Sequence, residues 1–436
     1  MTTKGYVKPS RPSCEQSPLW IGVLRSLTIG PVKRFARGFR EDDFLGSVAQ
    51  TLHSIGTKRM LVFDGTRELR SRGIASSIVR GFCDVQETAL LIRLLKYATT
   101  EWPQDAAARD VRLLEGVDDR EIQWALDAGL GPLLYRASRD SVLVDWRDAL
   151  LSADLTARVR HGNLVDTAKE VVDICQEMQI CPTLLKGISI SDQHYPVAHL
   201  RPMGDIDVLI PADSYGSVEA ALLRRGYLRK PDFRVSRGAR HGVPLAHPER
   251  RTWVELHTAL FDDDSLVDSV FRISNVTAQC VPSTFHGRRV YRLANELQLL
   301  YIASCWIGDL ARYDIEIHPS CVPPLLDVLF LLKASRKELD HSRLAVGAGS
   351  ETALASLYVM LAYLARHGLD QESHRLSRVL ASGQRIVGPL QLEIIHAVLD
   401  RYLIGGRLWN VPLPLPVPGR YSARHQLRKR LRGARH

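Results

Sequence analysis

The stretch Arg201–Ile210, which reads RPMGDIDVLI, is the part of the chain that decides its architecture. Its second half, Asp205–Ile210, alternates polar and apolar residues, which is typical of a strand with one buried face. Side chains two apart on a strand point the same way, so Asp205 and Asp207 share one face and the intervening residues point into the core. Two adjacent carboxylates repel each other unless a cation lies between them, and Mg²⁺ prefers oxygen ligands. The stretch therefore predicts a buried strand with a metal site on one face.

A third carboxylate lies in a second strand-like segment, Thr252–His257. The same alternation places Trp253, Glu255 and His257 on one face and buries the residues between them. If this strand pairs beside Asp205–Ile210, Glu255 reaches the two aspartates. A two-metal site for phosphoryl transfer needs such a set of three carboxylates.

The surrounding residues, 181–265, have an α/β pattern. Thr183–Leu185 is predicted to be a short strand that ends in a Lys-Gly turn. Asp213 is a suitable N-cap for a helix that Gly226 would end. Two further strands joined by Pro248–Arg251 are expected to form a hairpin.

Helical patterns lie on both sides of this segment. Residues 144–155 and 164–178 are predicted as separate amphipathic helices, and Asn295 is predicted to cap a later one. We expect an α+β fold in which a small mixed β-sheet core is embedded between two mostly helical regions. The predicted parts are an N-terminal extension (1–86), a helical region (87–180), the α/β core (181–265), a C-terminal helical region (266–411), and a proline-rich linker with a basic tail (412–436).

Positive charge is concentrated at the two ends of the chain. The 436 residues include 58 Lys and Arg against 48 Asp and Glu, a formal net charge of +10. Residues 1–40 carry +7 and residues 419–436 another +7, which leaves −4 for residues 41–418. This distribution excludes a uniformly basic globular protein.

Composition and cysteine usage favour a soluble cytoplasmic protein. The chain is 45% hydrophobic and 24% charged, as ordinary globular proteins are. Its seven cysteines form no CxxC pair, and their odd number argues against a disulfide framework or a zinc site. No signal peptide is visible, and apolar stretches such as Ala353–Ala365 are too short to cross a bilayer. We therefore expect no membrane partner.

Several short motifs together resemble a known family. They are LLKG at 184–187, YP at 195–196, RPMGDIDVLIP at 201–211, GY at 226–227 and VELH at 254–257. This pattern resembles the uncharacterised nucleotidyltransferase family of the DNA polymerase β-like superfamily, to which kanamycin nucleotidyltransferase and the minimal nucleotidyltransferases also belong. The similarity covers about residues 87 to 335, including GLGPLLY at 129–135 and LLD at 325–327.

The resemblance implies a short mixed sheet flanked by helices, with Asp205, Asp207 and Glu255 as ligands of two Mg²⁺ ions. It implies in-line attack of an acceptor hydroxyl on the α-phosphate of a nucleoside triphosphate, with pyrophosphate as the leaving group. Glu255 would also help to deprotonate the hydroxyl.

The resemblance also suggests candidate nucleotide contacts. Lys186-Gly187 stands where the superfamily usually has Gly-Ser, and it matches this family's own variant. Gly187 permits close approach of the backbone to a triphosphate, and the Lys186 ammonium offsets its charge. Arg201 is a further candidate phosphate contact. His257, on the face of Glu255, is a candidate contact to a phosphate or to the acceptor.

The acceptor and the partners stay open at this point. A small molecule, a peptide or protein side chain, and an RNA end are all possible acceptors. The basic stretch Arg229–Arg240 could receive an anionic substrate or be a solvated loop. His241 and His247 are expected on one strand face, where zinc would still need another ligand. Alternatives are a catalytically silent nucleotide-binding or interaction protein, and a nucleic-acid-binding protein that uses its ends, with weak contact through the C-terminal tail.

Overall fold

The structure, a computed structural model, describes ten segments of the chain. They are residues 90–100, 116–138, 144–235, 239–262, 268–310, 322–336, 338–340, 343–344, 351–380 and 387–403. The predicted N-terminal extension (1–86) and the predicted linker and basic tail (412–436) lie outside them. In the described segments, no helix combines the length and the apolar character that a membrane span requires.

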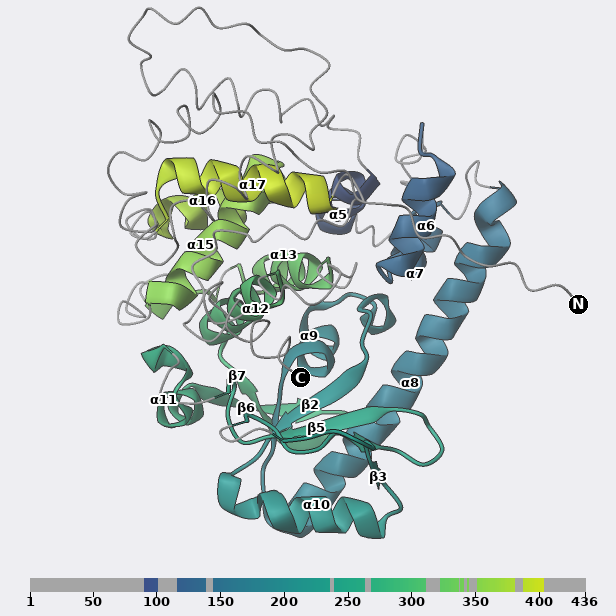
Figure 1. The fold of residues 1–436 in the computed structure, drawn as a ribbon, viewed down its shortest axis with the longest axis vertical. Helices are drawn as coiled ribbons and strands as arrows, with labels where there is room; N and C mark the ends of the chain where they lie inside the picture. Colours follow the sequence, from purple (N-terminus) through teal and green to yellow (C-terminus); the bar gives the residue numbers. More distant parts are fainter. Residues whose placement is uncertain are drawn as a thin grey trace, which may run out of the picture. The chain divides into compact units, whose positions relative to one another are not determined.

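Seven strands form one mixed sheet in the order β3-β4-β5-β2-β1-β7-β6 (Figure 1). The pairs β2–β5 and β1–β7 are parallel, and the other neighbours are antiparallel. The strands are β1 (Thr183–Leu184), β2 (Asp205–Leu209), β3 (Leu228–Arg229), β4 (Leu245–Ala246), β5 (Trp253–His257), β6 (Cys280–Phe285) and β7 (Arg288–Leu293). The predicted α+β class and the predicted β4–β5 hairpin are confirmed.

Among the described residues, four helices precede the sheet: α5 (Leu90–Thr100), α6 (Asp119–Asp127), α7 (Gly131–Ser138) and α8 (Arg147–Glu177). The prediction of two separate helices between residues 144 and 178 is wrong, because α8 runs unbroken for 31 residues. Most of the side chains at 155–163 are exposed or only partly buried, so this middle part lacks the apolar face that periodicity detects.

Three shorter helices lie between strands: α9 (Lys186–His194), α10 (Tyr215–Arg224) and α11 (Ile273–Ala278). Asp213 does not cap α10 as predicted. It lies in a 3₁₀ turn, Ala212–Ser214, and the N-cap residue is Ser214, whose side chain makes no capping hydrogen bond. The predicted stop at Gly226 is confirmed, since this glycine has a φ of +89° just after the helix.

The hairpin of β6 and β7 extends the sheet beyond residue 265, into the range predicted to be helical. Its turn residues, His286 and Gly287, both have positive φ, at 46° and 81°. Pro282 is tolerated in β6 because that strand is the edge of the sheet.

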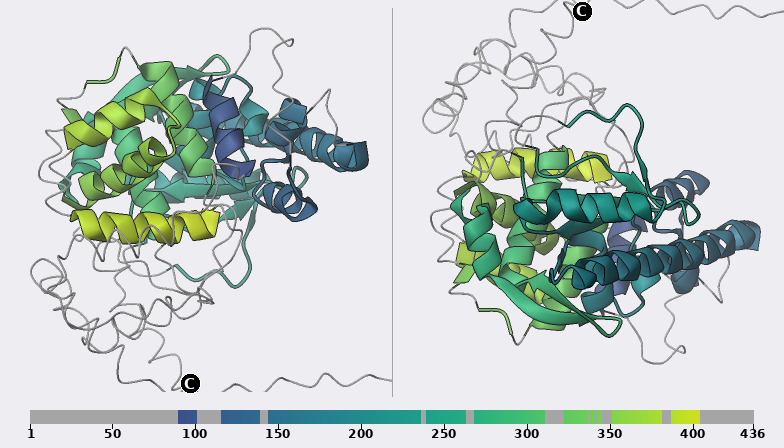
Figure 2. Two further views of the ribbon diagram at one scale, coloured as in Figure 1. Left: turned by 90° about the horizontal axis from the view of Figure 1, so that it is seen from above. Right: turned by 90° about the horizontal axis from the view of Figure 1, so that it is seen from below.

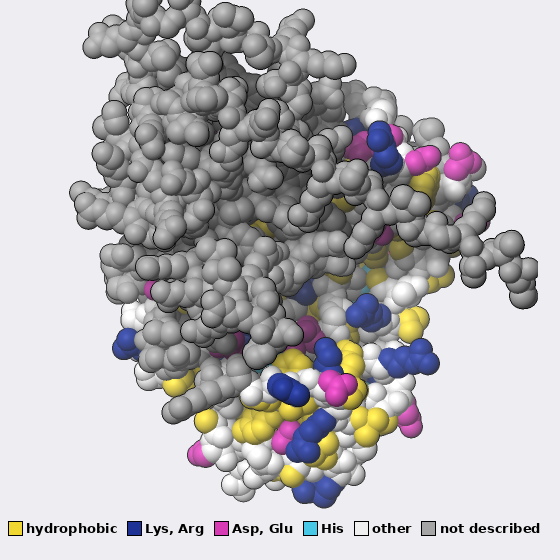
Figure 3. Space-filling view, in the orientation of Figure 1, with side chains coloured by type: hydrophobic (Ala, Val, Ile, Leu, Met, Phe, Trp, Pro, Cys, Tyr) yellow, Lys and Arg dark blue, Asp and Glu magenta, His cyan; other side chains and the backbone are white. Residues whose placement is uncertain are grey.

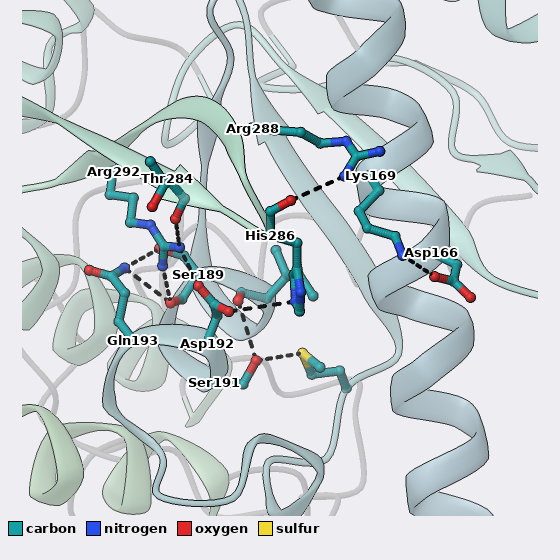
Figure 4. A network of polar contacts seen from close by, with 12 residues as sticks. Asp166, Lys169, Ser189, Ser191, Asp192, Gln193, Thr284, His286, Arg288 and Arg292 are labelled. Carbon is teal, nitrogen blue, oxygen red and sulfur yellow. Dashed lines mark hydrogen bonds and ion pairs between the residues drawn. The ribbon is translucent and has the colours of Figure 1, made fainter.

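Buried Arg292 of β7 connects this hairpin to α9 (Figure 4). The guanidinium is 1% exposed and donates to the carbonyls of Ser189 and Thr284, each at 2.9 Å. It also pairs with the carboxylate of Asp192. The hairpin therefore fixes the helix whose first residues are the predicted Lys-Gly turn.

The remaining helices are α12 (Asn295–Leu310), α13 (Pro323–Ser335), α15 (Glu351–Arg366), α16 (Gln371–Val379) and α17 (Pro389–Leu403). Asn295 does begin α12, as predicted. Side chains from these helices and from α5, α6 and α7 share one large apolar cluster. This cluster stabilises the α-helical part of the described structure.

The two faces of the sheet pack against different helices. Ile206, Val208, Val254 and Leu256 share a buried cluster with residues of α8 and α10, which both lie across this face (Figure 2). Leu209 belongs instead to the cluster that contains α12 and α13 residues. Figure 1 shows α10 on one side of the sheet and α9, α12 and α13 on the other. Asp205 and Asp207 alternate along β2 with Ile206 and Val208, which face α8 and α10. The two aspartates therefore face α9, α12 and α13.

We expect the free energy of unfolding to fall as the pH is lowered from 6.5 to 4. Burial and a nearby arginine lower the pKa of His194 to about 4, and they lower the pKa of His396 to about 4 as well. Between these pH values the unfolded chain binds protons that the folded chain does not, so stability rises with pH in this window. The loss should be about 3 kcal/mol per histidine. Urea unfolding at pH 7 and pH 4.5 measures it, and replacing both histidines with glutamine should flatten the dependence. Equal stability of the wild-type protein at both pH values would contradict the expectation.

Candidate active site

The predicted pairing of the two carboxylate-bearing strands is confirmed. Strands β2 and β5 are parallel neighbours, and their register places Asp207 opposite Glu255 and Asp205 opposite Trp253. Register partners in a sheet project from the same face. The three predicted carboxylates therefore lie on one face of two adjacent strands.

Asp207 is the most enclosed of these carboxylates, at 3% exposure. Its Oδ1 atom accepts a hydrogen bond of 2.8 Å from the Nζ of Lys186 and another of 2.8 Å from the Nε2 of His257. Burial alone would raise the pKa of Asp207, but the Lys186 and His257 side chains hold it well below its usual range. Asp207 is therefore ionised near neutral pH.

His257 is fully buried, with 0% exposure. Because Asp207 is a carboxylate, the Nε2 atom of His257 is the donor in their hydrogen bond, and the Nδ1 atom has no partner among the described residues. The predicted contact of His257 with a substrate stays a prediction. What the structure shows is that the imidazole orients Asp207.

Asp205 and Glu255 differ in their electrostatics. Burial and the neighbouring charge of Asp207 raise the pKa of Asp205 to about 6. Although burial favours protonated Glu255, the adjacent His257 lowers the pKa of Glu255 below its ordinary value. The Oε2 atom of Glu255 lies 3.6 Å from the Nε2 of His257 and 3.6 Å from that of His241. A cation close to Asp205 would stabilise the ionised form of this carboxyl group and lower its pKa.

Three side chains offer a set of ligand atoms for a metal ion. Asp207, Glu255 and His257 each place one such atom within 4.8 Å of the others, and they form the one group of this kind among the described residues. Two carboxylate oxygens and an imidazole nitrogen are chemically suited to a divalent cation. Asp205 supplies a further carboxylate on the same face.

Two of the three carboxylates, Asp205 and Asp207, open onto a cavity of about 860 Å³, whose lining residues do not include Glu255. Asp205, Asp207, Lys186 and Gly187 line one side of it, and residues of α8 and α12 line others. This volume lies within the range of small-molecule sites. The cavity is large enough for a nucleotide-sized ligand beside the carboxylates.

Helix α9 begins at the edge of this cavity with an unusual backbone. Lys186 has a φ of 43°, in the left-handed region that a lysine seldom adopts. A Cβ atom on Gly187 would lie 2.7 Å from a guanidinium nitrogen of Arg201 and 2.8 Å from Met203. Gly187 is therefore needed for packing as well as for the predicted approach of a ligand. The N-terminal amides of α9 favour an anion here.

Comparison with models of protein families finds one whose description is uncharacterised nucleotidyltransferase. It matches residues 118–370, which is more than half of the chain. The chain belongs to this family. Membership supports a general role in nucleotidyl transfer, and the matched residues include the whole sheet, the carboxylates and α13. A search of curated proteins finds no match.

In this chain, Arg201 makes an ion pair with a buried carboxylate that the sequence did not reveal. Its Nε and Nη2 atoms donate to the two carboxylate oxygens of Asp327, at 3.2 and 2.8 Å. Tyr195 donates its hydroxyl to the same carboxylate at 2.7 Å. Asp327 is 2% exposed and comes from α13. Arg201 also lines the cavity, so its predicted contact with a phosphate stays a prediction.

The GLGPLLY segment packs directly onto the core motif. Gly129 has a φ of 74°, and a Cβ atom there would lie 2.8 Å from the Cβ of Pro202. A Cβ atom on Gly131 would lie 2.8 Å from the Cβ of Ala153 in α8. The two glycines allow the connection between α6 and α7 to touch both Pro202 and α8. The helical region thereby forms one wall of the cavity.

The described residues of the basic stretch Arg229–Arg240 contact different parts of the structure. Arg229 makes a two-point contact with Glu219 of α10 at 3.1 and 3.0 Å, and Lys and Arg side chains stand among hydrophobic ones around this helix (Figure 3). Lys230 lies 5.5 Å from the ring centre of Trp253. Within the described part of the stretch, Arg240 alone lines the cavity.

The two histidines of the zinc alternative contact different elements, so the prediction that they share a strand face is wrong. His241 lies beside Glu255, whereas the Nε2 atom of His247 lies 3.3 Å from a carboxylate oxygen of Glu170 in α8. The reason is that β4 spans only Leu245–Ala246, so strand alternation does not extend back to His241.

Proposed function

We propose that the protein transfers a nucleoside monophosphate from a nucleoside triphosphate to a hydroxyl or similar acceptor and releases pyrophosphate. The observation that carries this proposal is the placement of three carboxylates on one face of β2 and β5, where Asp205 and Asp207 line a cavity that the N-terminus of α9 also lines. A polyanionic triphosphate needs cationic partners, and the carboxylates need cations. The carboxylates of β2 and β5 would hold metal ions, and the start of α9 would bind the phosphates that those ions neutralise.

The ligand set supports a site for two Mg²⁺ ions held by Asp205, Asp207 and Glu255. Oxygen atoms dominate the set, as Mg²⁺ requires, and burial and the charge of Asp207 raise the pKa of Asp205, so a bound cation would favour its charged form. Bound Mg²⁺ would stabilise charge on the attacking and leaving oxygens. His257 holds the Asp207 carboxylate in place through its Nε2 hydrogen bond.

The other residues of the site would bind the triphosphate and the acceptor. The first amides of α9, with Gly187 and the Lys186 ammonium, would bind phosphate oxygens. Arg201 and Arg240 line the same cavity and add positive charge beside them. Glu255, whose pKa is lowered, is ionised and would accept the proton of an acceptor hydroxyl.

Nucleotide binding tests this proposal without knowledge of the acceptor. The purified chain should bind at least one of ATP, GTP, CTP and UTP in isothermal titration when Mg²⁺ is present. Affinity should fall by about tenfold or more when EDTA removes the metal or when Asp205 is replaced with asparagine. Asp213→Asn, on an exposed turn, is the matched control and should bind like the wild-type chain. The proposal would be contradicted if none of the four nucleotides bound in the presence of Mg²⁺.

A second candidate is a silent protein that binds nucleotides without transferring them. The contact of the Lys186 ammonium with Asp207 favours it, because a cation of the chain already neutralises one carboxylate. A silent protein would bind a nucleoside triphosphate and release it intact. Pyrophosphate formation in the presence of an extract of its native cells separates the two candidates, and that extract can supply a small-molecule, peptide or RNA acceptor.

A further inference from the structure

We propose that Lys186 is an exchangeable counter-ion of Asp207, which it leaves when a triphosphate binds, so that metal and nucleotide can occupy the site only together. This inference rests on the proposed function and deepens it. Lys186 would exclude divalent metal from the empty site. It would then move its charge to the phosphates as the metal takes the Asp207 carboxylate.

The Lys186 ammonium lies where it competes with a metal ion. Its Nζ atom is 2.8 Å from the Oδ1 atom of Asp207, and Asp207 belongs to the set of ligand atoms formed with Glu255 and His257. The Oδ1 atom of Asp207 accepts hydrogen bonds from both Lys186 and His257, and a metal ion on either oxygen of this carboxylate would lie close to the ammonium charge. This repulsion opposes metal binding until the ammonium moves.

The Lys186 side chain has space in the cavity into which it can move. Its side chain is 26% exposed, whereas that of Asp207 is 3% exposed, and both residues line the 860 Å³ cavity. Lysine carries a compact charge on a flexible four-carbon chain that can change rotamer at low cost. An anion bound at the start of α9 would lie close to the same backbone position and would attract the ammonium.

The backbone at Lys186 also indicates that the side chain has a role. A residue with a φ of 43° is strained unless it is glycine or asparagine, and such strain persists where the surroundings maintain it. Glycine would adopt this conformation without cost. The lysine is therefore not explained by the turn itself, and the contact with Asp207 is what its side chain adds.

Exclusion of metal ions from the nucleotide-free site matters because its carboxylate ligands do not select Mg²⁺ alone. Carboxylates such as Asp205, Asp207 and Glu255 also bind transition metals such as Mn²⁺, which compete with Mg²⁺ for the site. An ammonium on Asp207 opposes binding of any of these ions in the absence of nucleotide. By linkage, the same competition makes a metal ion and a triphosphate increase each other's affinity by an equal factor.

Titration of the full chain with Mn²⁺ alone, followed by the electron paramagnetic resonance signal of free Mn²⁺, tests the proposal. The wild-type chain should bind Mn²⁺ weakly, and a non-hydrolysable triphosphate analogue should increase its affinity about tenfold or more. Lys186→Met should bind Mn²⁺ about tenfold more tightly than the wild-type chain without any nucleotide. Most of the increase caused by the analogue should disappear in this variant.

Matched variants assign the effect to Asp207 and to the charge of Lys186. Lys169→Met removes a lysine that lies 2.5 Å from Asp166 on the surface of α8, and it should leave Mn²⁺ binding unchanged. Lys186→Arg keeps the charge and should keep Mn²⁺ binding weak. Adding Asp207→Asn to Lys186→Met should remove the gained affinity.

Two results would overturn the proposal. One is a folded Lys186→Met chain, shown by circular dichroism, that binds Mn²⁺ no more tightly than the wild-type chain. The other needs no variant: a wild-type chain that binds the analogue but binds Mn²⁺ as tightly alone as with it. Neither result bears on nucleotide transfer, so failure of this inference is distinguishable from failure of the proposed function.

Discussion

Replacing Asp207 with asparagine is expected to lower the rate of nucleotide transfer by about 10³-fold or more. Asp207 is the carboxylate on which Lys186, His257 and the proposed metal converge, and the lowered pKa keeps it charged. Asparagine has the same shape but supplies no charge to hold a cation. The rate is measured as transfer of label from an α-labelled nucleoside triphosphate into an extract of the native cells.

The fold of the Asp207→Asn chain should survive, because the Lys186 ammonium can turn toward the open cavity. Thermal unfolding followed by circular dichroism checks this point. Asp213→Asn, which removes an exposed carboxylate in the 3₁₀ turn after β2, should transfer label at the wild-type rate. An Asp207→Asn chain that keeps more than about a tenth of the wild-type rate would contradict the assigned role.

The second large effect concerns stability. Replacing Arg201 with methionine should lower the free energy of unfolding by about 3–5 kcal/mol, because it leaves the Asp327 carboxylate buried and without its cationic partner. Asp327 is 2% exposed, and its remaining described hydrogen bond comes from the Tyr195 hydroxyl. Urea unfolding followed by circular dichroism measures the loss.

The double variant Arg201→Met/Asp327→Leu is the matched control for this prediction. It removes both charges together, so it should recover most of the stability that Arg201→Met loses. The Tyr195 hydroxyl would still lack its acceptor, at a cost of about 1 kcal/mol. If Arg201→Met unfolds like the wild-type chain but binds nucleotide poorly, Arg201 is a phosphate contact rather than a structural link to α13.

Local periodicity was sufficient to predict the carboxylate strands. Alternation in Asp205–Ile210 and Thr252–His257 determines which side chains share a face, and the structure pairs the two strands in the register that joins Asp207 to Glu255. Both strands are bounded by turn residues, which is the condition under which a strand pattern is most informative.

Contacts between distant segments could not be predicted in the same way. Arg201 and Asp327 are 126 residues apart, and nothing local links them. One signal was available: Asp327 is the single acid within the apolar run of α13, and a charged group in such a helix needs a buried partner. The signal shows that a partner exists, but it does not identify Arg201.

The sequence did not predict the edge strand β6 or the correct N-cap of α10, and the reason in each case is local. Strand β6 contains Pro282, and Phe285 is its single buried residue, so it lacks the alternation of a half-buried strand. The α10 helix begins at Tyr215 after a 3₁₀ turn, which moves the N-cap one residue past Asp213. Helix ends often shift by such amounts because capping energies are about 1 kcal/mol.

One measurement tests the central claim most directly: the fate of two labels on the same nucleoside triphosphate. The chain is incubated with Mg²⁺, an extract of its native cells, and the nucleotide labelled in parallel at the α- or the γ-phosphate. The account predicts that the α label enters the acceptor, that the γ label appears in pyrophosphate, and that Asp207→Asn abolishes both. Transfer of the γ label to the acceptor, or equal transfer by Asp207→Asn, would contradict it.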